Sequence, residues 1–160
     1  MAATDTVPAL DTIHHVGFIV KDFDRMVEFY TTLTGKEVDT EASLRGKHIR
    51  QQFQKQTGLE AEVDVAFIQL ASDGAIEMIR YVEPGAEREP EQTPANRPGI
   101  NHFCFKVDDV EGVYARLREA GYDTHGDPVH FGEDAGPLEG YVFGYFDDPE
   151  GNVLEVIQEP

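Results

Sequence analysis

The chain has 160 residues and a formal net charge of −18, because 31 residues are Asp or Glu and only 13 are Lys or Arg. Charge of this sign repels phosphate groups, so we expect neither nucleic acid nor an anionic membrane surface as a partner. No apolar run reaches the ~18 residues of a membrane span, and residues 1–10 lack the basic and apolar regions of a signal peptide. The single cysteine, Cys104, forms no intrachain disulfide. Together these features predict a cytoplasmic protein.

The first predicted elements, a strand and a helix, occur twice in the chain. Residues 13–22 read Ile-His-His-Val-Gly-Phe-Ile-Val-Lys-Asp, and residues 100–109 read Ile-Asn-His-Phe-Cys-Phe-Lys-Val-Asp-Asp. Apolar residues at helical spacing follow each of them, over 23–33 and over 110–120. This repetition indicates two related modules in one chain.

The remaining predicted elements of each half are strands. The last strands are alike, since residues 74–79 read Gly-Ala-Ile-Glu-Met-Ile and residues 151–157 read Gly-Asn-Val-Leu-Glu-Val-Ile. Strands are expected between the helix and the last strand of each half over 36–42, 63–70, 122–125 and 141–146. Each half therefore has the order β-α-β-β-β. We predict an α+β fold of two tandem modules, whose helices pack outside curved sheets that surround a shared cavity.

Composition places the boundaries of these modules. Residues 83–98 hold four of the nine prolines and few apolar residues, which is typical of a linker. The predicted organisation is an N-terminal tail over 1–11, a first module over 12–82, the linker, and a second module over 99–158.

Each half also places a His and a Glu inside otherwise apolar strands, where an unpartnered charge is costly. These are His15 and Glu77 in the first half and His102 and Glu155 in the second. A single strand His is more often structural, and a single strand Glu often faces solvent. The same pair at matching positions in both halves favours a divalent-metal site, since imidazoles suit Zn, Ni, Co and Fe and carboxylates extend the choice towards Mn.

These segments resemble the vicinal oxygen chelate superfamily, which includes glyoxalase I, methylmalonyl-CoA epimerase, extradiol dioxygenases and the bleomycin resistance proteins. The first strands of both halves carry the resemblance, together with the closing Asp-Asp-Pro-Glu-Gly-Asn-Val-Leu-Glu-Val-Ile of residues 147–157. The resemblance implies paired β-α-β-β-β modules around one metal ion per site. It places the ligands on the first and last strands of the modules, at His15, Glu77, His102 and Glu155. It does not specify the metal among Zn, Ni, Co, Mn and Fe.

A complete set of two His and two Glu ligands resembles the glyoxalase I and epimerase branch. That branch implies a lyase or isomerase that removes a proton beside a carbonyl of a small-molecule substrate, through a metal-stabilised enediolate or enolate. Glu155 or Glu77 would then act as the base. Asp64, on the third predicted strand of the first half, is a candidate second base or else faces solvent. His14, next to His15, is interpreted as structural.

Several alternatives stay open from the sequence. A ring-cleaving Fe(II) dioxygenase would use only His15, His102 and Glu155, and a non-catalytic binding or resistance protein would need none of the ligands. Residues 44–58 are polar and are expected to form a loop or a short helix. A basic cluster within them either steers an anionic substrate or belongs to a solvated loop; its members are Arg45, Lys47, Arg50 and Lys55. Family precedent favours a homodimer, with modules paired within one chain or exchanged between two.

Overall fold

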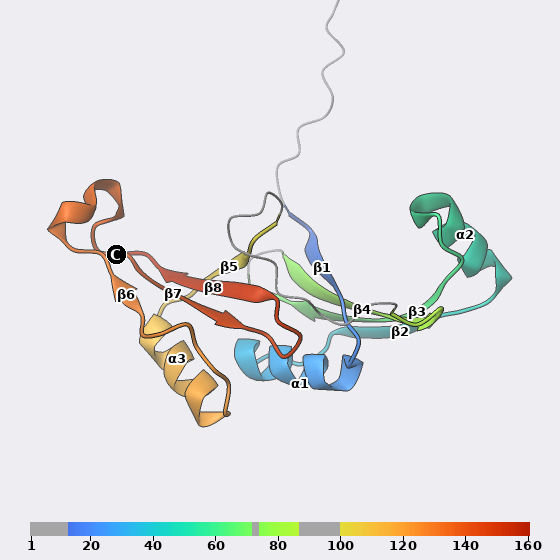
Figure 1. Ribbon diagram of the computed structural model, residues 1–160, viewed down its shortest axis with the longest axis horizontal. Helices are drawn as coiled ribbons and strands as arrows, with labels where there is room; N and C mark the ends of the chain where they lie inside the picture. The colour runs from blue at the N-terminus through green and yellow to red at the C-terminus, as the bar shows by residue number, and fades with distance from the viewer. Residues whose placement is uncertain (1–12, 72–73, 87–99) are drawn as a thin grey trace, which may run out of the picture.

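The computed structural model describes residues 13–71, 74–86 and 100–160. The tail over 1–11 and most of the predicted linker lie outside these residues, and Glu83, the first linker residue, instead ends a strand. The first module consists of β1 (His15–Ile19), α1 (Phe23–Thr34), β2 (Thr40–Leu44), α2 (Lys47–Thr57), β3 (Glu62–Gln69) and β4 (Ala75–Glu83) (Figure 1). The second consists of β5 (Phe103–Lys106), α3 (Val110–Glu119), β6 (Val129–His130), the 3₁₀ helix η1 (Glu133–Leu138), β7 (Val142–Asp147) and β8 (Val153–Gln158).

The two modules have the same sheet topology. The strand orders are β1-β4-β3-β2 and β5-β8-β7-β6, with the first and last strands of each module parallel and the other neighbours antiparallel. This confirms the predicted α+β fold with two β-α-β-β-β modules. Each module contributes an open sheet of four strands, and the two sheets are not closed into a barrel (Figure 1).

The structure decides one segment that the sequence left open, and it differs from one predicted strand. The segment 44–58, for which the sequence allows a loop or a short helix, contains the helix α2, which Phe53 anchors to the sheet through an apolar cluster with Val63 and Val65. The strand expected over 122–125 is reduced to one bridge between Thr124 and Phe146, and the edge strand β6 forms further along the chain.

Aspartates begin the two long helices of the repeat. The Asp22 carboxylate accepts from the Arg25 amide at 3.3 Å, and the Asp109 carboxylate accepts from the Gly112 amide at 2.9 Å. Each bond satisfies an amide that would otherwise lack a partner at the helix N-terminus. These caps fix where α1 and α3 start beneath their sheets.

The hydrophobic core lies between the sheets and the helices α1 and α3, and it runs through both modules. The Phe18 ring of β1 packs against the Phe103 ring of β5, with centroids 4.8 Å apart. The buried Tyr30 hydroxyl of α1 donates to the Asp148 carboxylate at 3.0 Å. The two modules are therefore packed as one unit through their helix-covered faces. Within the described residues, no helix is both long and apolar enough to cross a bilayer.

Candidate metal centre in two half-sites

The first half-site lies on the face of its sheet opposite α1. In β1, alternation directs Phe18 into the core and leaves His15 and Gly17 on the other face. The parallel pairing of β1 with β4 then brings the imidazole next to Glu77, with His15 Nε2 3.2 Å from Glu77 Oε2. The Glu77 side chain is only 16% exposed. A carboxylate and an imidazole nitrogen thus converge at one point of the surface.

The second half-site repeats this arrangement. His102 directly precedes β5, and its Nε2 lies 2.9 Å from Glu155 Oε2 on β8. The Glu155 side chain is 12% exposed. The structure therefore brings the four predicted ligands together in two His–Glu pairs, one on each sheet.

A neighbouring polar residue orients each imidazole. His14 Nδ1 lies 2.8 Å from His15 Nδ1, and Asn101 Oδ1 lies 3.1 Å from His102 Nδ1. His14 and Asn101 occupy equivalent positions of the repeat. When the histidine Nδ1–H donates to such a neighbour, Nε2 carries the lone pair that a metal requires. The sequence indicates only a structural role for His14, and it gives no signal for Asn101 beyond its position before His102.

The cross-strand neighbours of the two carboxylates differ. Gly17 and Phe67 stand opposite Glu77 in the strand register, whereas Cys104 and Tyr145 stand opposite Glu155. Burial raises the pKa of the Tyr145 phenol, and the charge of Glu155 and a hydrogen bond to it act in the same direction.

Cys104 is influenced in the same way. It reaches the surface of the sheet, yet desolvation by its surroundings raises the pKa of its thiol to about 12, again aided by the charge of Glu155 and a hydrogen bond to it. Both groups therefore stay protonated beside Glu155 at neutral pH.

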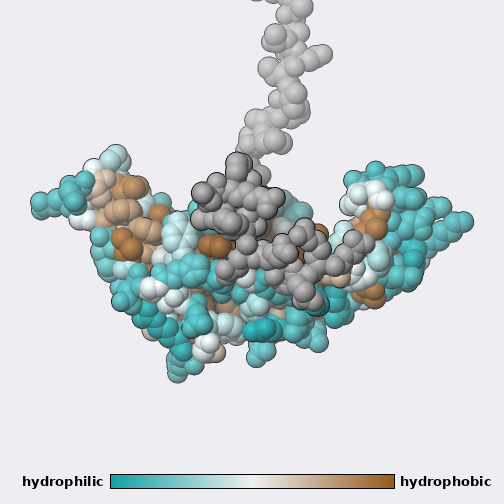
Figure 2. Space-filling view, viewed as in Figure 1, coloured by the Kyte–Doolittle hydropathy of each residue, from teal (hydrophilic) through white to brown (hydrophobic). Residues whose placement is uncertain are grey.

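Apolar side chains surround both half-sites. In the second module, Phe143 stacks on Phe131 with centroids 5.0 Å apart, and it meets the Tyr145 ring at 5.8 Å. In the first module, Phe53 of α2 packs against Tyr81 over the same face of the sheet. Figure 2 shows this apolar surface on the hollowed side of the molecule, near both ends. Apolar side chains therefore lie beside the polar groups of both half-sites.

The donor set fits a divalent cation, although one chain does not gather all four ligands. Two imidazole nitrogens and two carboxylates are typical ligands of Zn and related metals, and two carboxylates balance a double positive charge. Across 13–71, 74–86 and 100–160, no three His, Cys, Asp or Glu side chains converge into a metal-binding group. Each half-site therefore supplies half of the predicted centre.

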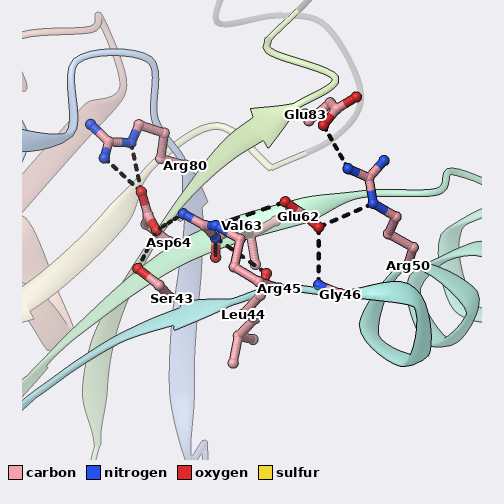
Figure 3. A network of polar contacts seen from close by, with 10 residues as sticks. All are labelled: Ser43, Leu44, Arg45, Gly46, Arg50, Glu62, Val63, Asp64, Arg80 and Glu83. Carbon is pink, nitrogen blue, oxygen red and sulfur yellow. Dashed lines mark hydrogen bonds and ion pairs between the residues drawn. The ribbon is translucent and has the colours of Figure 1, made fainter.

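Asp64 lies away from these pairs. It stands opposite Arg80 in the register of β3 and β4, on the face that packs against α1, while Glu77 points from the other face. Its carboxylate accepts from Ser43 Oγ at 2.7 Å, from both Arg80 Nε at 3.1 Å and Arg80 Nη2 at 2.6 Å, and from Arg45 Nη2 (Figure 3).

These contacts make Asp64 unsuited to proton transfer. Burial would raise the pKa of this carboxyl, but the bonds from Arg80, Ser43 and Arg45 outweigh it and lower the pKa to about 2. The interpretation of Asp64 as a second base at the metal does not fit its position, and neither does its alternative as a solvent-facing residue.

Two arginines of the predicted basic cluster form ion pairs with carboxylates of the same chain. Arg45 pairs with Asp64, and Arg50 bridges Glu62, at 3.1 Å, and Glu83, at 2.5 Å (Figure 3). The Glu62 carboxylate also accepts from the Gly46 amide at 2.9 Å, at the start of α2. These two arginines hold α2 to the sheet edge, which weakens the expectation that the cluster steers an anionic substrate.

Comparison with known proteins identifies the family. A model of the glyoxalase/bleomycin resistance protein/dioxygenase superfamily matches residues 12–156. The chain belongs to this superfamily. A 2-epi-5-epi-valiolone epimerase from Actinomyces sp. is 29% identical over 156 residues, which cover 96% of this chain and 82% of that protein.

Solved structures have the same fold. The crystal structure of a glyoxalase family protein from Bacillus cereus superposes with a TM-score of 0.77 at 18% identity, covering 99% of both chains. A trypanothione-dependent glyoxalase I from Leishmania major superposes with a TM-score of 0.61 at 18% identity, covering 93% of this chain and 87% of that one. The superfamily includes metal-dependent enzymes that act on small molecules.

Proposed function

We propose that the protein is a divalent-metal-dependent lyase or isomerase, of the glyoxalase or epimerase type, that moves a proton beside a carbonyl of a small substrate. The observation that carries this proposal is the repeated His–Glu pair, with His15 next to Glu77 and His102 next to Glu155. The epimerase named among its relatives supports the same class of reaction. Zn, Ni, Co, Mn and Fe all suit this ligand set.

The histidines and glutamates of the two pairs would have different roles. His15 and His102 would bind the metal through Nε2, with their Nδ1 atoms held by His14 and Asn101. The metal, when bound, stabilises negative charge that develops on the carbonyl oxygen. A glutamate of the site takes the proton from the neighbouring carbon and returns it, and the apolar walls exclude water from this exchange.

The four ligands would meet when the first module of one copy faces the second module of another. Members of this superfamily commonly form dimers, and the face with the His–Glu pairs exposes apolar residues, among them Ile19, which is 62% exposed. A homodimer would thus complete two equivalent sites. Its exposed free Cys104 suits the reducing cytoplasm.

Metal analysis of the purified protein tests this proposal. We expect the wild-type protein to bind about one Zn²⁺ per chain, and E77A and E155A to bind it at least ~10-fold more weakly, because each removes a charged ligand. E41A, which removes an exposed glutamate of β2, is the matched control and should bind like the wild type. Equal binding by all four proteins would contradict the proposed ligands.

The reaction class needs a second measurement. Neutral 2-hydroxy ketones, 2-oxo thioesters and hemithioacetals would be incubated with the metal-loaded protein in D₂O. Deuterium incorporation beside the carbonyl is expected for at least one of these classes. Oxygen consumption with a catechol, without exchange into any of them, would indicate the dioxygenase alternative instead.

A further inference from the structure

The internal repeat allows each half-site to serve as a control for the other. The metal ligands are the same in both, and the helix-covered faces of their strands are similarly apolar. The difference lies in the residues beside each carboxylate. A phenol and a thiol flank Glu155, while a phenyl ring and a glycine flank Glu77.

Tyr145 is well placed to hold the Glu155 carboxylate. Directly opposed residues on neighbouring strands have Cβ atoms ~5 Å apart, so their side chains interact. The Tyr145 ring is fixed from two sides, by the His102 ring at 5.4 Å and the Phe143 ring at 5.8 Å, both nearly perpendicular to it. A ring held in this way keeps its hydroxyl directed at one place. Cys104 adds a second, weaker donor from the other side of Glu155.

The neighbours of Glu77 lack these donors. The Phe67 ring stands where Tyr145 stands in the other half, and it packs edge-on against the His15 ring at 5.9 Å. Gly17 stands where Cys104 stands, and a Cβ added there would lie 3.3 Å from Glu77 Oε2. The glycine therefore spares the Glu77 carboxylate the crowding that a larger side chain would cause, and it supplies no side-chain donor that would hold this carboxylate.

We infer that Tyr145, assisted by Cys104, is a positioning residue that keeps Glu155 in place as a fixed ligand, which leaves Glu77 as the carboxylate that moves and carries the proton. This inference rests on the proposed metal site and assigns unequal roles to its two glutamates. In the step itself, the C–H bond beside the carbonyl breaks, its electron pair shifts towards the carbonyl oxygen, and the proton bonds to Glu77. Glu77 then returns this proton to carbon, so that no oxidant or reductant is needed.

Exchanging the phenol between the half-sites tests the positioning role. Zn²⁺ affinity would be measured by competition with a chromophoric chelator for the wild type, Y145F, F67Y and the double variant. Loss of an outer hydrogen bond to a metal ligand typically weakens metal binding by 10–100-fold. We expect about 10-fold weaker binding for Y145F, no weakening for F67Y, and recovery towards the wild type in the double variant. C104S, which keeps a donor, should bind more tightly than C104A.

A crystal structure of the Zn²⁺ form with acetohydroxamate, a chelator with two adjacent oxygens, tests the moving carboxylate. We expect Glu77 to leave the metal and Glu155 to remain, and the reverse in the double variant. Displacement of Glu155 in the wild type, displacement of neither carboxylate, or equal loss of affinity in Y145F and F67Y would overturn the inference. A wild-type protein that binds no Zn²⁺ would instead show that the proposed function fails.

Discussion

Replacing Asp64 by Asn separates a structural role from a catalytic one. The Asp64 side chain is 9% exposed and accepts hydrogen bonds from Ser43, Arg45 and Arg80. Breaking a buried ion pair costs about 3–5 kcal/mol. Because the Arg45 and Arg80 side chains are 36% and 38% exposed, screening by solvent reduces this to about 2–3 kcal/mol. The lowering of the Asp64 pKa from 3.8 to about 2 corresponds to a similar free energy, about 2 kcal/mol.

For a chain of this size, such a loss lowers the melting temperature by about 5–10 °C. Thermal unfolding followed by circular dichroism at pH 7 measures it, with the exposed Asp123→Asn as the matched control. The folded-state pKa lies below the ordinary value, so this stabilisation is full above about pH 5 and is lost as the pH falls through 4 towards 2. The difference between the wild type and D64N should therefore shrink on acidification.

Two results would refute this reasoning. If D64N unfolded like the wild type at pH 7, the ion-pair network would not stabilise the sheet as described. If D64N kept its stability and its metal but lost deuterium exchange, Asp64 would be the base that the sequence alone suggested. The loss of stability in D64N, with metal affinity close to that of the wild type, is the expected outcome.

Three further predictions concern other parts of the molecule. Y30F removes the buried bond to Asp148 that joins the modules, and it should lower the free energy of unfolding by about 1 kcal/mol, measured by urea titration. Zn²⁺ at 100 times its dissociation constant should raise the free energy of unfolding of the wild type by about 2.7 kcal/mol, which is measured as a rise in melting temperature. This rise should be largely absent in H15A. The Cys104 thiol, with its pKa raised to about 12, should react slowly with iodoacetamide at pH 8. E155Q should speed this alkylation, and an unchanged rate would contradict the influence of Glu155.

Much of the fold follows from the sequence because the repeat constrains it. The offset between residues 13–22 and 100–109 aligns strands, helices and the two His–Glu pairs, and strict alternation fixes which side chains share a face. The sequence leaves the structure open where short-range pattern does not decide it. The helix α2 is polar and has no fully buried residue of its own, so its sequence fits a loop as well as a short helix. Its position on the sheet depends on the packing of Phe53 and on the ion pairs of Arg50 with Glu62 and Glu83.

The sequence determines less of the site than of the fold. Alternation correctly places Asp64 on the face opposite to Val63 and Val65, but the sequence does not reveal that this face is covered by α1 and holds Arg80. Similarly, the sequence does not reveal that Tyr145 stands opposite Glu155, because this register depends on how β7 pairs with β8. Pairing between strands is a long-range property, and residue spacing alone does not determine it.

Joint purification of two complementary variants tests the central claim most directly. H15A/E77A lacks the ligands of the first half-site, and H102A/E155A lacks those of the second. Co-expression with different affinity tags yields mixed dimers, in which one site has all four ligands if each site combines modules of two copies. We predict one tightly bound Zn²⁺ per mixed dimer and none in either variant alone. Mixed dimers without Zn²⁺, beside a wild-type protein that binds it, would contradict a site shared between copies. A wild-type protein without Zn²⁺ would contradict the metal centre itself.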